Sequence, residues 1–100
     1  MWYVLDGKKT IPCSDLKKVE ELLSSEENKR VGLDILDKYE VSTVFLALDH
    51  NYGGKDQPLL FETGVFQKGD YSEMLECLRA STWDAAEENH KQLLQKYRNL

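Results

Sequence analysis

Apolar residues dominate two stretches in the middle of the chain, VSTVFLALDHNYGG (Val41–Gly54) and PLLFETGVF (Pro58–Phe66), and polar residues and glycines lie between them. This pattern predicts two strands joined by a polar, glycine-rich loop. The stretches carry Asp49, His50 and Glu62 among hydrophobic neighbours. Polar side chains in buried strands need a hydrogen-bonding partner or a ligand, so these three residues are the first candidates for a binding site.

The N-terminal pattern predicts a β-hairpin and then a helix. Trp2–Leu5 and Lys8–Ile11 flank Asp6-Gly7, a dipeptide that suits a type I′ turn, and Pro12 ends the second strand because it has no ladder donor. Ser14 or Asp15 then caps a helix. Its apolar residues recur at helical spacing and are Leu16, Val19, Leu22 and Leu23.

Two further strands, Arg30–Leu36 and Tyr39–Asp49, are expected around a turn at Asp37-Lys38. The longer strand is apolar on both faces, so we expect it to be central and covered on both sides, once by a helix and once by a second helix or another subunit. The segment Tyr71–Ala80 fits either a helix or a strand, and we favour a short strand near Cys77–Ala80.

The last helix has the clearest signature. Ser81 and Asp84 form an S-x-x-D cap, and the apolar stripe consists of Trp83, Ala86, His90, Leu93 and Tyr97. Together these elements predict one domain, residues 1–100, of the α+β class. Its sheet is a mostly antiparallel meander with an N-terminal hairpin and two packed helices.

Composition limits the partners. Hydrophobic residues make up 41% and charged residues 31% of the chain, as in an ordinary globular domain, and the net charge is −5. We expect no duplex DNA partner, because the basic residues are scattered, and no membrane span. A compact anionic ligand needs only two or three cations. Cys13 and Cys77 are expected to be reduced thiols in a cytoplasmic protein without a secretion signal.

Each candidate residue also has a structural interpretation. Asp49 and His50, with Tyr52, either line a pocket mouth or stabilise the end of the strand. Glu62 either pairs with Arg79 or Arg30 or accepts N–H groups of a ligand. His90 and Trp83 on the last helix are most simply core residues. Ser81 and Thr82, preceded by Arg79, either cap the helix or hold a phosphate at its N-terminus.

Catalytic motifs are not evident in the sequence. There is no HExxH metal pattern, GxSxG nucleophile, phosphate-binding P-loop or Rossmann glycine pattern. We therefore expect no metal and no cofactor. A small hydrolase with Asp49 and either His50 or His90 as acid and base remains an alternative.

Three ordered blocks, VSTVFLALDHNYGG, PLLFETGVF and STWDAAEENH, resemble a group of small phage and prophage proteins with blocks like VSTVFLGLDH, PLLFETMVF and YSTWEEAEAGH. This chain departs from that pattern at four positions. They are Ala47 for Gly, Gly64 for Met, Ala80 for Tyr and Asn89 for Gly. The functions of the group are largely not known, so the resemblance implies a phage accessory protein in the cytoplasm of a bacterial host.

Small phage proteins of this kind often counter host defence, and one route is to sequester a cyclic nucleotide of the host's immune system without cleaving it. For such a ligand, aromatic rings could stack on bases, and hydroxyl groups and arginine could hold phosphates. We expect a homo-oligomer, a dimer or a tetramer, around this small anionic nucleotide. The alternative is an acidic inhibitor that binds a host enzyme. The candidate ligand-binding residues are Thr43, Phe45, Asp49, His50, Tyr52, Glu62, Arg79, Ser81, Thr82, Trp83 and His90.

Overall fold

The computed structural model describes residues 1–49 and 57–100, and its elements confirm the α+β class. The predicted roles of His50, Tyr52 and Gly53-Gly54 fall outside these residues. In chain order the elements are β1 (Tyr3–Asp6), β2 (Lys9–Pro12), α1 (Leu16–Leu23), α2 (Glu26–Lys29), β3 (Arg30–Ile35), β4 (Tyr39–Phe45), β5 (Phe61–Gln67), β6 (Glu76–Ala80) and α3 (Trp83–Arg98).

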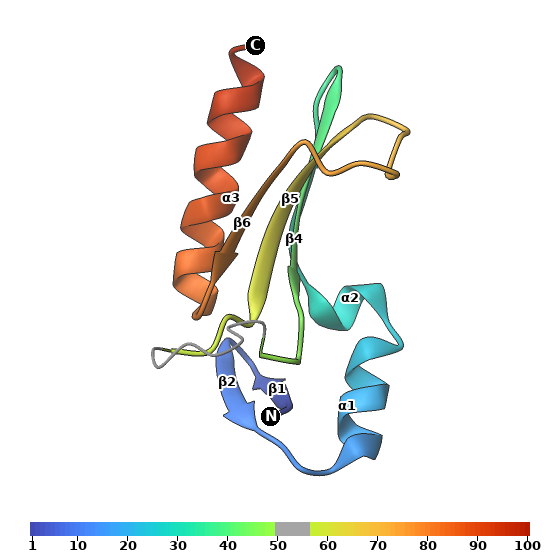
Figure 1. Ribbon diagram of the computed structural model, residues 1–100, viewed down its shortest axis with the longest axis vertical. Helices are drawn as coiled ribbons and strands as arrows, with labels where there is room; N and C mark the ends of the chain where they lie inside the picture. The colour runs from blue at the N-terminus through green and yellow to red at the C-terminus, as the bar shows by residue number, and fades with distance from the viewer. Residues whose placement is uncertain (50–56) are drawn as a thin grey trace.

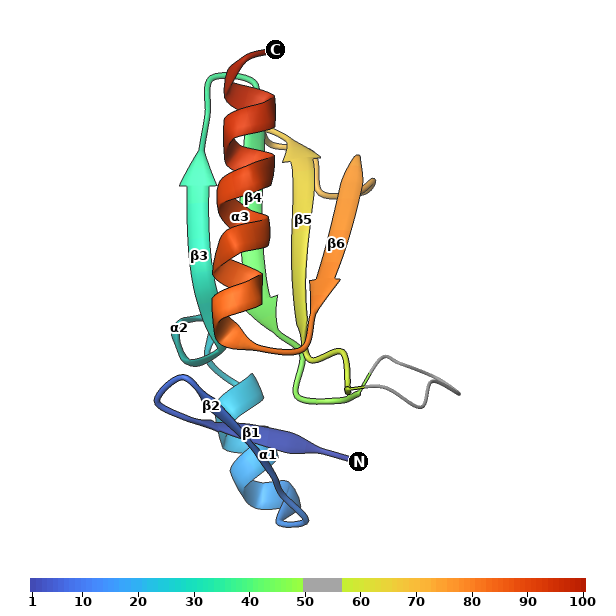
Figure 2. The same cartoon turned by 90° about the vertical axis from the view of Figure 1, so that its left-hand side faces the viewer.

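Strands β3, β4, β5 and β6 form one antiparallel sheet in the order of the chain, and β1 and β2 form a separate hairpin. The long helix α3 runs along one face of the four-stranded sheet (Figure 2). We call this side of the sheet the covered face and the opposite side the open face. The meander, the hairpin and the two packed helices were all predicted, and α2 is an additional short helix.

The core lies between the covered face and α3. Phe45 and Phe61 are paired across β4 and β5, and their rings lie 5.3 Å apart at an angle of 55°. Both are fully buried, as is Leu60 just before β5. From α3, the predicted stripe supplies Ala86 and Leu93 as buried residues. Burial of this apolar surface is the main stabilising term for so small a domain.

Of the two covers expected for the other side of the sheet, the second helix does not lie there, and another subunit stays a prediction. Figure 1 shows α1 and the β1–β2 hairpin beyond one end of the sheet, where they pack on each other. Val19 of α1 is buried there in the same cluster as Phe45 and Ala47. The open face therefore has no helix of this chain laid along it within the described residues.

Strand β4 ends at Phe45 instead of Asp49, because the backbone turns at Ala47. This residue has a φ of +64°, in the left-handed region that favours glycine. The turned segment pairs with the N-terminus: Tyr3 N–H donates to the Ala47 carbonyl at 2.7 Å, and Trp2 forms a bridge with Leu48. The end of the central strand thus anchors the hairpin.

Two local details differ from the sequence-based expectation, and a third confirms it. The hairpin turn is centred on Gly7 and Lys8, one residue later, since Asp6 pairs with Lys9 and Gly7 takes the positive φ of +61°. The cap of α3 is Thr82, whose hydroxyl accepts from Ala85 N–H at 3.2 Å. The segment before α3 forms the short strand that the sequence favoured, and this strand is β6.

Candidate functional site

A chain of polar side chains crosses the covered face. His90 Nδ1 lies 2.7 Å from the Thr43 hydroxyl, which lies 2.7 Å from the Thr63 hydroxyl. On the other side of the ring, His90 Nε2 lies 2.7 Å from Asp34 Oδ2 of β3. One tautomer satisfies every group: the ring donates from Nε2 to Asp34 and accepts at Nδ1 from Thr43, which accepts from Thr63.

These hydrogen bonds link an acid, an imidazole and two hydroxyl groups, but the hydroxyl groups are out of reach of a substrate. Thr43 and Thr63 are 0% and 1% exposed, between the sheet and α3. His90 lines a small hollow of about 120 Å³ together with Asp34, and the ring rests on Gly32 of β3. The arrangement satisfies buried polar groups and orients α3 on the sheet, so Thr43 and His90 act here as structural residues.

Phe45 and Trp83, also among the predicted site residues, belong to the apolar core. Trp83 is half-buried at the start of α3 and meets the ring of Phe61 edge-on, with centroids 6.2 Å apart. Its indole N–H donates to Glu87 Oε1 at 2.6 Å, one turn along the helix. The partner expected for this N–H therefore comes from α3 itself.

Asp49 and the residues before α3 make local contacts. Asp49 Oδ1 accepts from Leu59 N–H at 2.9 Å and so ties together the two ends of the segment between β4 and β5. Thr82 serves as the helix cap, and Ser81 is half-buried beside it. These contacts match the structural interpretation of each residue.

Glu62 and Arg79 meet on the open face. They are directly opposite each other on β5 and β6, and Arg79 Nε donates to Glu62 Oε2 at 3.2 Å. Glu62 keeps 19% of its side chain exposed and Arg79 keeps 42%, so the pair lies at the surface of the sheet and not in its interior. Of the two partners considered from the sequence, the structure selects Arg79 over Arg30.

The strand register places the open-face residues in three rows across the sheet. The first row runs through Ile35, Glu40 and Phe66, and the middle row through Leu33, Ser42, Gly64 and Cys77. The last row is Arg30, Val44, Glu62 and Arg79. The predicted binding residues are thus divided between two faces: Thr43, Phe45, Trp83 and His90 lie on the covered face, and Glu62 and Arg79 on the open face.

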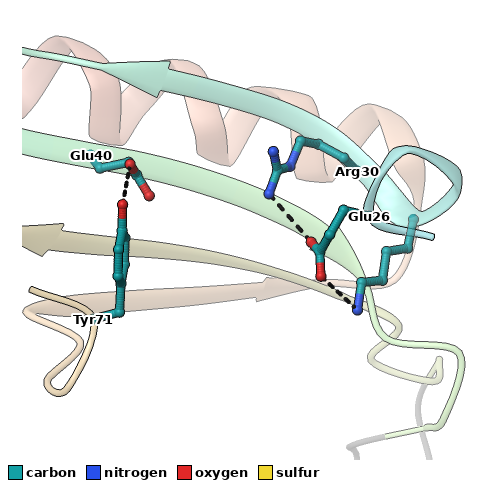
Figure 3. Close-up of polar contacts among 5 residues, drawn as sticks. Glu26, Arg30, Glu40 and Tyr71 are labelled. Carbon is teal, nitrogen blue, oxygen red and sulfur yellow. Dashed lines mark hydrogen bonds and ion pairs between the residues drawn. The ribbon is translucent and has the colours of Figure 1, made fainter. Parts of the chain in front are cut away.

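An aromatic pair marks the first row. The ring of Tyr71, from the β5–β6 connection, meets Phe66 nearly edge-on with centroids 5.6 Å apart, and its hydroxyl donates to Glu40 Oε1 at 2.9 Å (Figure 3). The hydrogen bond to this carboxylate raises the pKa of Tyr71, because the bond is lost when the phenol ionises. Tyr71 stays 60% exposed, so its ring is accessible from solvent.

Charged groups surround the opposite end of the open face. Glu26 of α2 accepts from Arg30 Nη2 at 3.3 Å and lies 3.3 Å from Lys29 Nζ (Figure 3). Arg30 Nε is buried and has no hydrogen-bond partner among the described residues. With Arg79, this end carries three cations against the carboxylates Glu26 and Glu62.

Sequence reasoning missed Phe66 and Tyr71 as site residues, although one signal for Phe66 was present. In FETGVF, Phe66 and Glu62 are four residues apart in a strand and must share a face. Cys77 also lies on this face and is exposed. Desolvation by neighbouring groups raises the pKa of its thiol, and the nearby Glu62 carboxylate adds to the shift.

The comparisons with known proteins add no relative: no family model, no curated protein and no solved structure matches the chain. None of the helices in residues 1–49 and 57–100 has the length and apolar character of a membrane span. The function is therefore argued from the geometry of the open face.

Proposed function

We propose that this protein captures a small anionic nucleotide on the open face of its sheet and holds it without cleaving it. In this proposal the protein is a phage accessory protein that acts as a homo-oligomer in the cytoplasm of a bacterial host. Its ligand is a cyclic nucleotide of the host's immune system, and duplex DNA is not a partner. The resemblance to small phage proteins supports the biological setting, and the open face supports the chemistry.

The observation that carries the proposal is that aromatic rings, with Tyr71 exposed and Phe66 half-buried, share one face of the sheet with two arginines. Phe66 and Tyr71 lie at one end of the open face, and Arg30 and Arg79 lie at the other. Phe66 and Glu62 are four residues apart on β5, which corresponds to roughly 13 Å along a strand. This span accommodates a base on the rings and a phosphate near the guanidinium groups.

Within residues 1–49 and 57–100, the positions of the acid–base groups support capture without cleavage. The imidazole of His90 and the hydroxyl groups of Thr43 and Thr63 point into the covered face and are bonded to one another. On the open face, Glu62 is engaged with Arg79 and Glu40 with Tyr71. Carboxylates in this setting can accept N–H groups of a base edge. They serve recognition in this proposal and take no part in bond breaking.

The test is capture and release with a defined ligand panel. The purified protein is incubated with cyclic di- and trinucleotides, washed, and heat-denatured, and the released nucleotide is identified by mass spectrometry. The proposal expects one nucleotide to be retained and returned intact. A chemically altered nucleotide would point to the hydrolase, and no retention would point to the protein-binding inhibitor, so both results contradict the proposal.

Matched variants locate the site. Replacing Tyr71 by Leu removes the exposed ring, and loss of one base stack of about 1–3 kcal/mol weakens capture roughly 5- to 150-fold. Arg79→Gln should weaken capture as well, because it removes a charge from the phosphate end. Arg98→Gln, at the far end of α3, is the control and should capture like the parent protein. Equal loss in all three variants would contradict a site on the open face.

A further inference from the structure

The open face carries more exposed apolar surface than a sheet that faces only water. Leu33, Ile35 and Met74 are 38%, 57% and 38% exposed, and Tyr71 projects above them from the β5–β6 connection. Contiguous exposed apolar residues of this kind, rimmed by charges, mark sites of association. Leu33 and Ile35 lie on the edge strand, away from the arginines of the last row, so the phosphate and base contacts proposed above leave them exposed.

We propose that a second copy of this chain covers the open face, related by a two-fold axis that runs across the strands, over the middle row. This inference rests on the homo-oligomer of the proposed function, and it does not depend on the nucleotide. The axis passes over Leu33, Ser42, Gly64 and Cys77, a row without charged side chains. Leu33, Ser42 and Cys77 then face their own counterparts in the second copy, and over β5 the row is capped by Met74, which lies on Gly64.

The charges of the two outer rows select this axis. The row with Ile35, Glu40 and Phe66 carries one negative charge, and the row with Arg30, Glu62 and Arg79 carries a net charge of +1. Rotation about the axis across the strands lays the negative row of one copy over the positive row of the other. An axis parallel to the strands would instead put Arg30 over Arg79 of the second copy, which like charges disfavour.

The shape of the open face fits the same arrangement. The β5–β6 connection that carries Tyr71 lies over the β5–β6 half at one end of the face, and α2 lies beside β3 at the other end (Figure 3). These two projections occupy diagonal corners. The two-fold rotation therefore brings each projection over a corner of the second copy that has none, so the sheets can approach each other.

The rotation also brings aromatic and charged side chains of one copy close to possible partners in the other. Tyr71 of one copy, whose ring lies against Phe66 of β5, comes over the Glu62–Arg79 pair of the other, where the guanidinium group can form a cation–π contact. Glu26 and Lys29 of α2 come near the turn at Asp37 and Lys38 of the second copy, with opposite charges available on both sides. The aromatic pair of each copy thereby faces the cations of the other, so in the dimer a nucleotide would lie between the rings of one copy and the cations of the other, at two equivalent ends of the interface.

The area sets the expected affinity. Four strands of about six residues present a face of roughly 400 Å² in projection, and side-chain relief and the two projections enlarge it. Two such faces amount to roughly 800 Å² in projection, and with this enlargement the buried area approaches the lower end for specific interfaces, about 1,200 Å². We expect a dimer that dissociates in the micromolar range.

The experiment is sedimentation equilibrium on the full chain without nucleotide, between roughly 1 and 200 µM, the range in which a micromolar dimer dissociates. The mass should rise from that of one chain to that of two. Leu33→Glu places two carboxylates face to face on the axis and should leave a folded monomer at every concentration. Leu16→Glu is the matched control, because Leu16 is an exposed leucine on α1, far from the open face, and this variant should remain dimeric.

Crosslinking identifies the face independently of the glutamate variants. Sheets packed face to face lie about 10 Å apart, too far for a disulfide but within reach of a short bismaleimide. With Cys13→Ser, leaving Cys77 as the thiol, the reagent should give a covalent dimer, and with Cys77→Ser it should not. A monomer throughout, a Leu33→Glu dimer, or a crosslink through Cys13 alone would overturn the inference.

The two proposals fail in different ways. A wild-type dimer that retains no nucleotide leaves the interface intact and removes the proposed function. A monomer that retains a nucleotide removes the interface and leaves the proposed function. Capture by a dimer that Leu33→Glu converts into a non-binding monomer would show that the two copies share the site.

Discussion

The covered and open faces are built from the same strands and differ in what their side chains meet. On the covered face, Val41, Thr43 and Phe45 of β4 are at most 1% exposed beneath α3. Their neighbours Ser42 and Val44, which point the other way, are half-buried. One face therefore provides most of the folding energy, and the other retains side chains that the monomer does not need to bury. Such a division leaves the second face available for binding.

Replacing a phenylalanine on each face of β5 tests this division most directly and has the largest expected effect. Phe61→Ala should destabilise the protein by about 3–5 kcal/mol, because it empties the centre of the core. Phe66→Ala, on the open face, should cost the monomer only about 1 kcal/mol, since its ring is partly exposed. Urea denaturation at low protein concentration measures both.

The same pair of variants also reports on association. If a second copy covers Phe66, the cost of Phe66→Ala should grow with protein concentration, whereas that of Phe61→Ala should not. Equal costs for the two variants at low concentration would mean that the faces are not different in the way described.

The polar chain of the covered face gives the next largest effect. Thr43→Val leaves His90 Nδ1 buried without its partner and should cost about 1–3 kcal/mol. Thr63→Val should cost less, because Thr43 can still donate to the ring. Denaturation of the two variants side by side measures the difference. A larger cost for Thr63→Val would show that the hydrogen bonds run in the opposite direction.

Two glycines test the same difference between the faces, because Gly32 lies under a side chain on the covered face and Gly64 under one on the open face. A Cβ on Gly32 would meet the His90 ring at 3.1 Å, and that ring is held by hydrogen bonds on both sides, so Gly32→Ala should destabilise the protein by roughly 1 kcal/mol. A Cβ on Gly64 would meet the terminal methyl of Met74 at 2.8 Å, but this flexible side chain can move.

Gly64→Ala should therefore change stability by less than about 1 kcal/mol, with the better strand propensity of alanine offsetting the displaced methionine. In a Met74→Ala background the same substitution should become stabilising, as thermal unfolding would measure. Strong destabilisation in both backgrounds would indicate that backbone packing, and not Met74, limits this position.

The smallest effect concerns pH. Lys96 and Tyr97 of α3 donate to Glu76 Oε1 at 2.8 and 3.0 Å, and these hydrogen bonds hold the pKa of Glu76 below its usual value of 4.5. The stability that this carboxylate contributes is present above that value and is lost as the pH falls through the lowered pKa. Glu76→Gln should flatten the acid limb of the melting temperature between about pH 5 and pH 3. An unchanged acid limb would assign the loss of stability to other carboxylates.

Local patterns predicted most of the fold, because each element has its own signal. The stripe of α3, the alternation in β5 and the glycine-containing turns depend only on neighbouring residues. The end of β4 did not follow this rule: the apolar run continues to Leu48, yet the backbone turns at Ala47, where the resembled phage pattern has glycine. The tertiary contact with Tyr3 outweighs the local preference for a strand.

The site was harder to predict, since it depends on which face each strand presents. The pairing of Glu62 with Arg79 was one of two predicted from the sequence, because a carboxylate inside an apolar strand needs a cation. The sequence could not exclude Thr43 or His90, whose partners are 20 to 56 residues away and come into contact only when the sheet and α3 have assembled. Tyr71 had no signal, since its position over Phe66 depends on the path of a loop.

The hydrogen bond between Asp49 Oδ1 and Leu59 N–H has a practical consequence for engineering. It holds together the two ends of the connection between β4 and β5. The stability of the sheet should therefore depend on how this connection begins and ends more than on how many residues it contains. For a flexible insertion, each doubling of loop length costs only about 0.6 kcal/mol. A peptide tag or a fluorophore-bearing segment inserted between these two ends should leave both faces of the sheet unchanged. A fluorophore at this position would report on binding to the sheet.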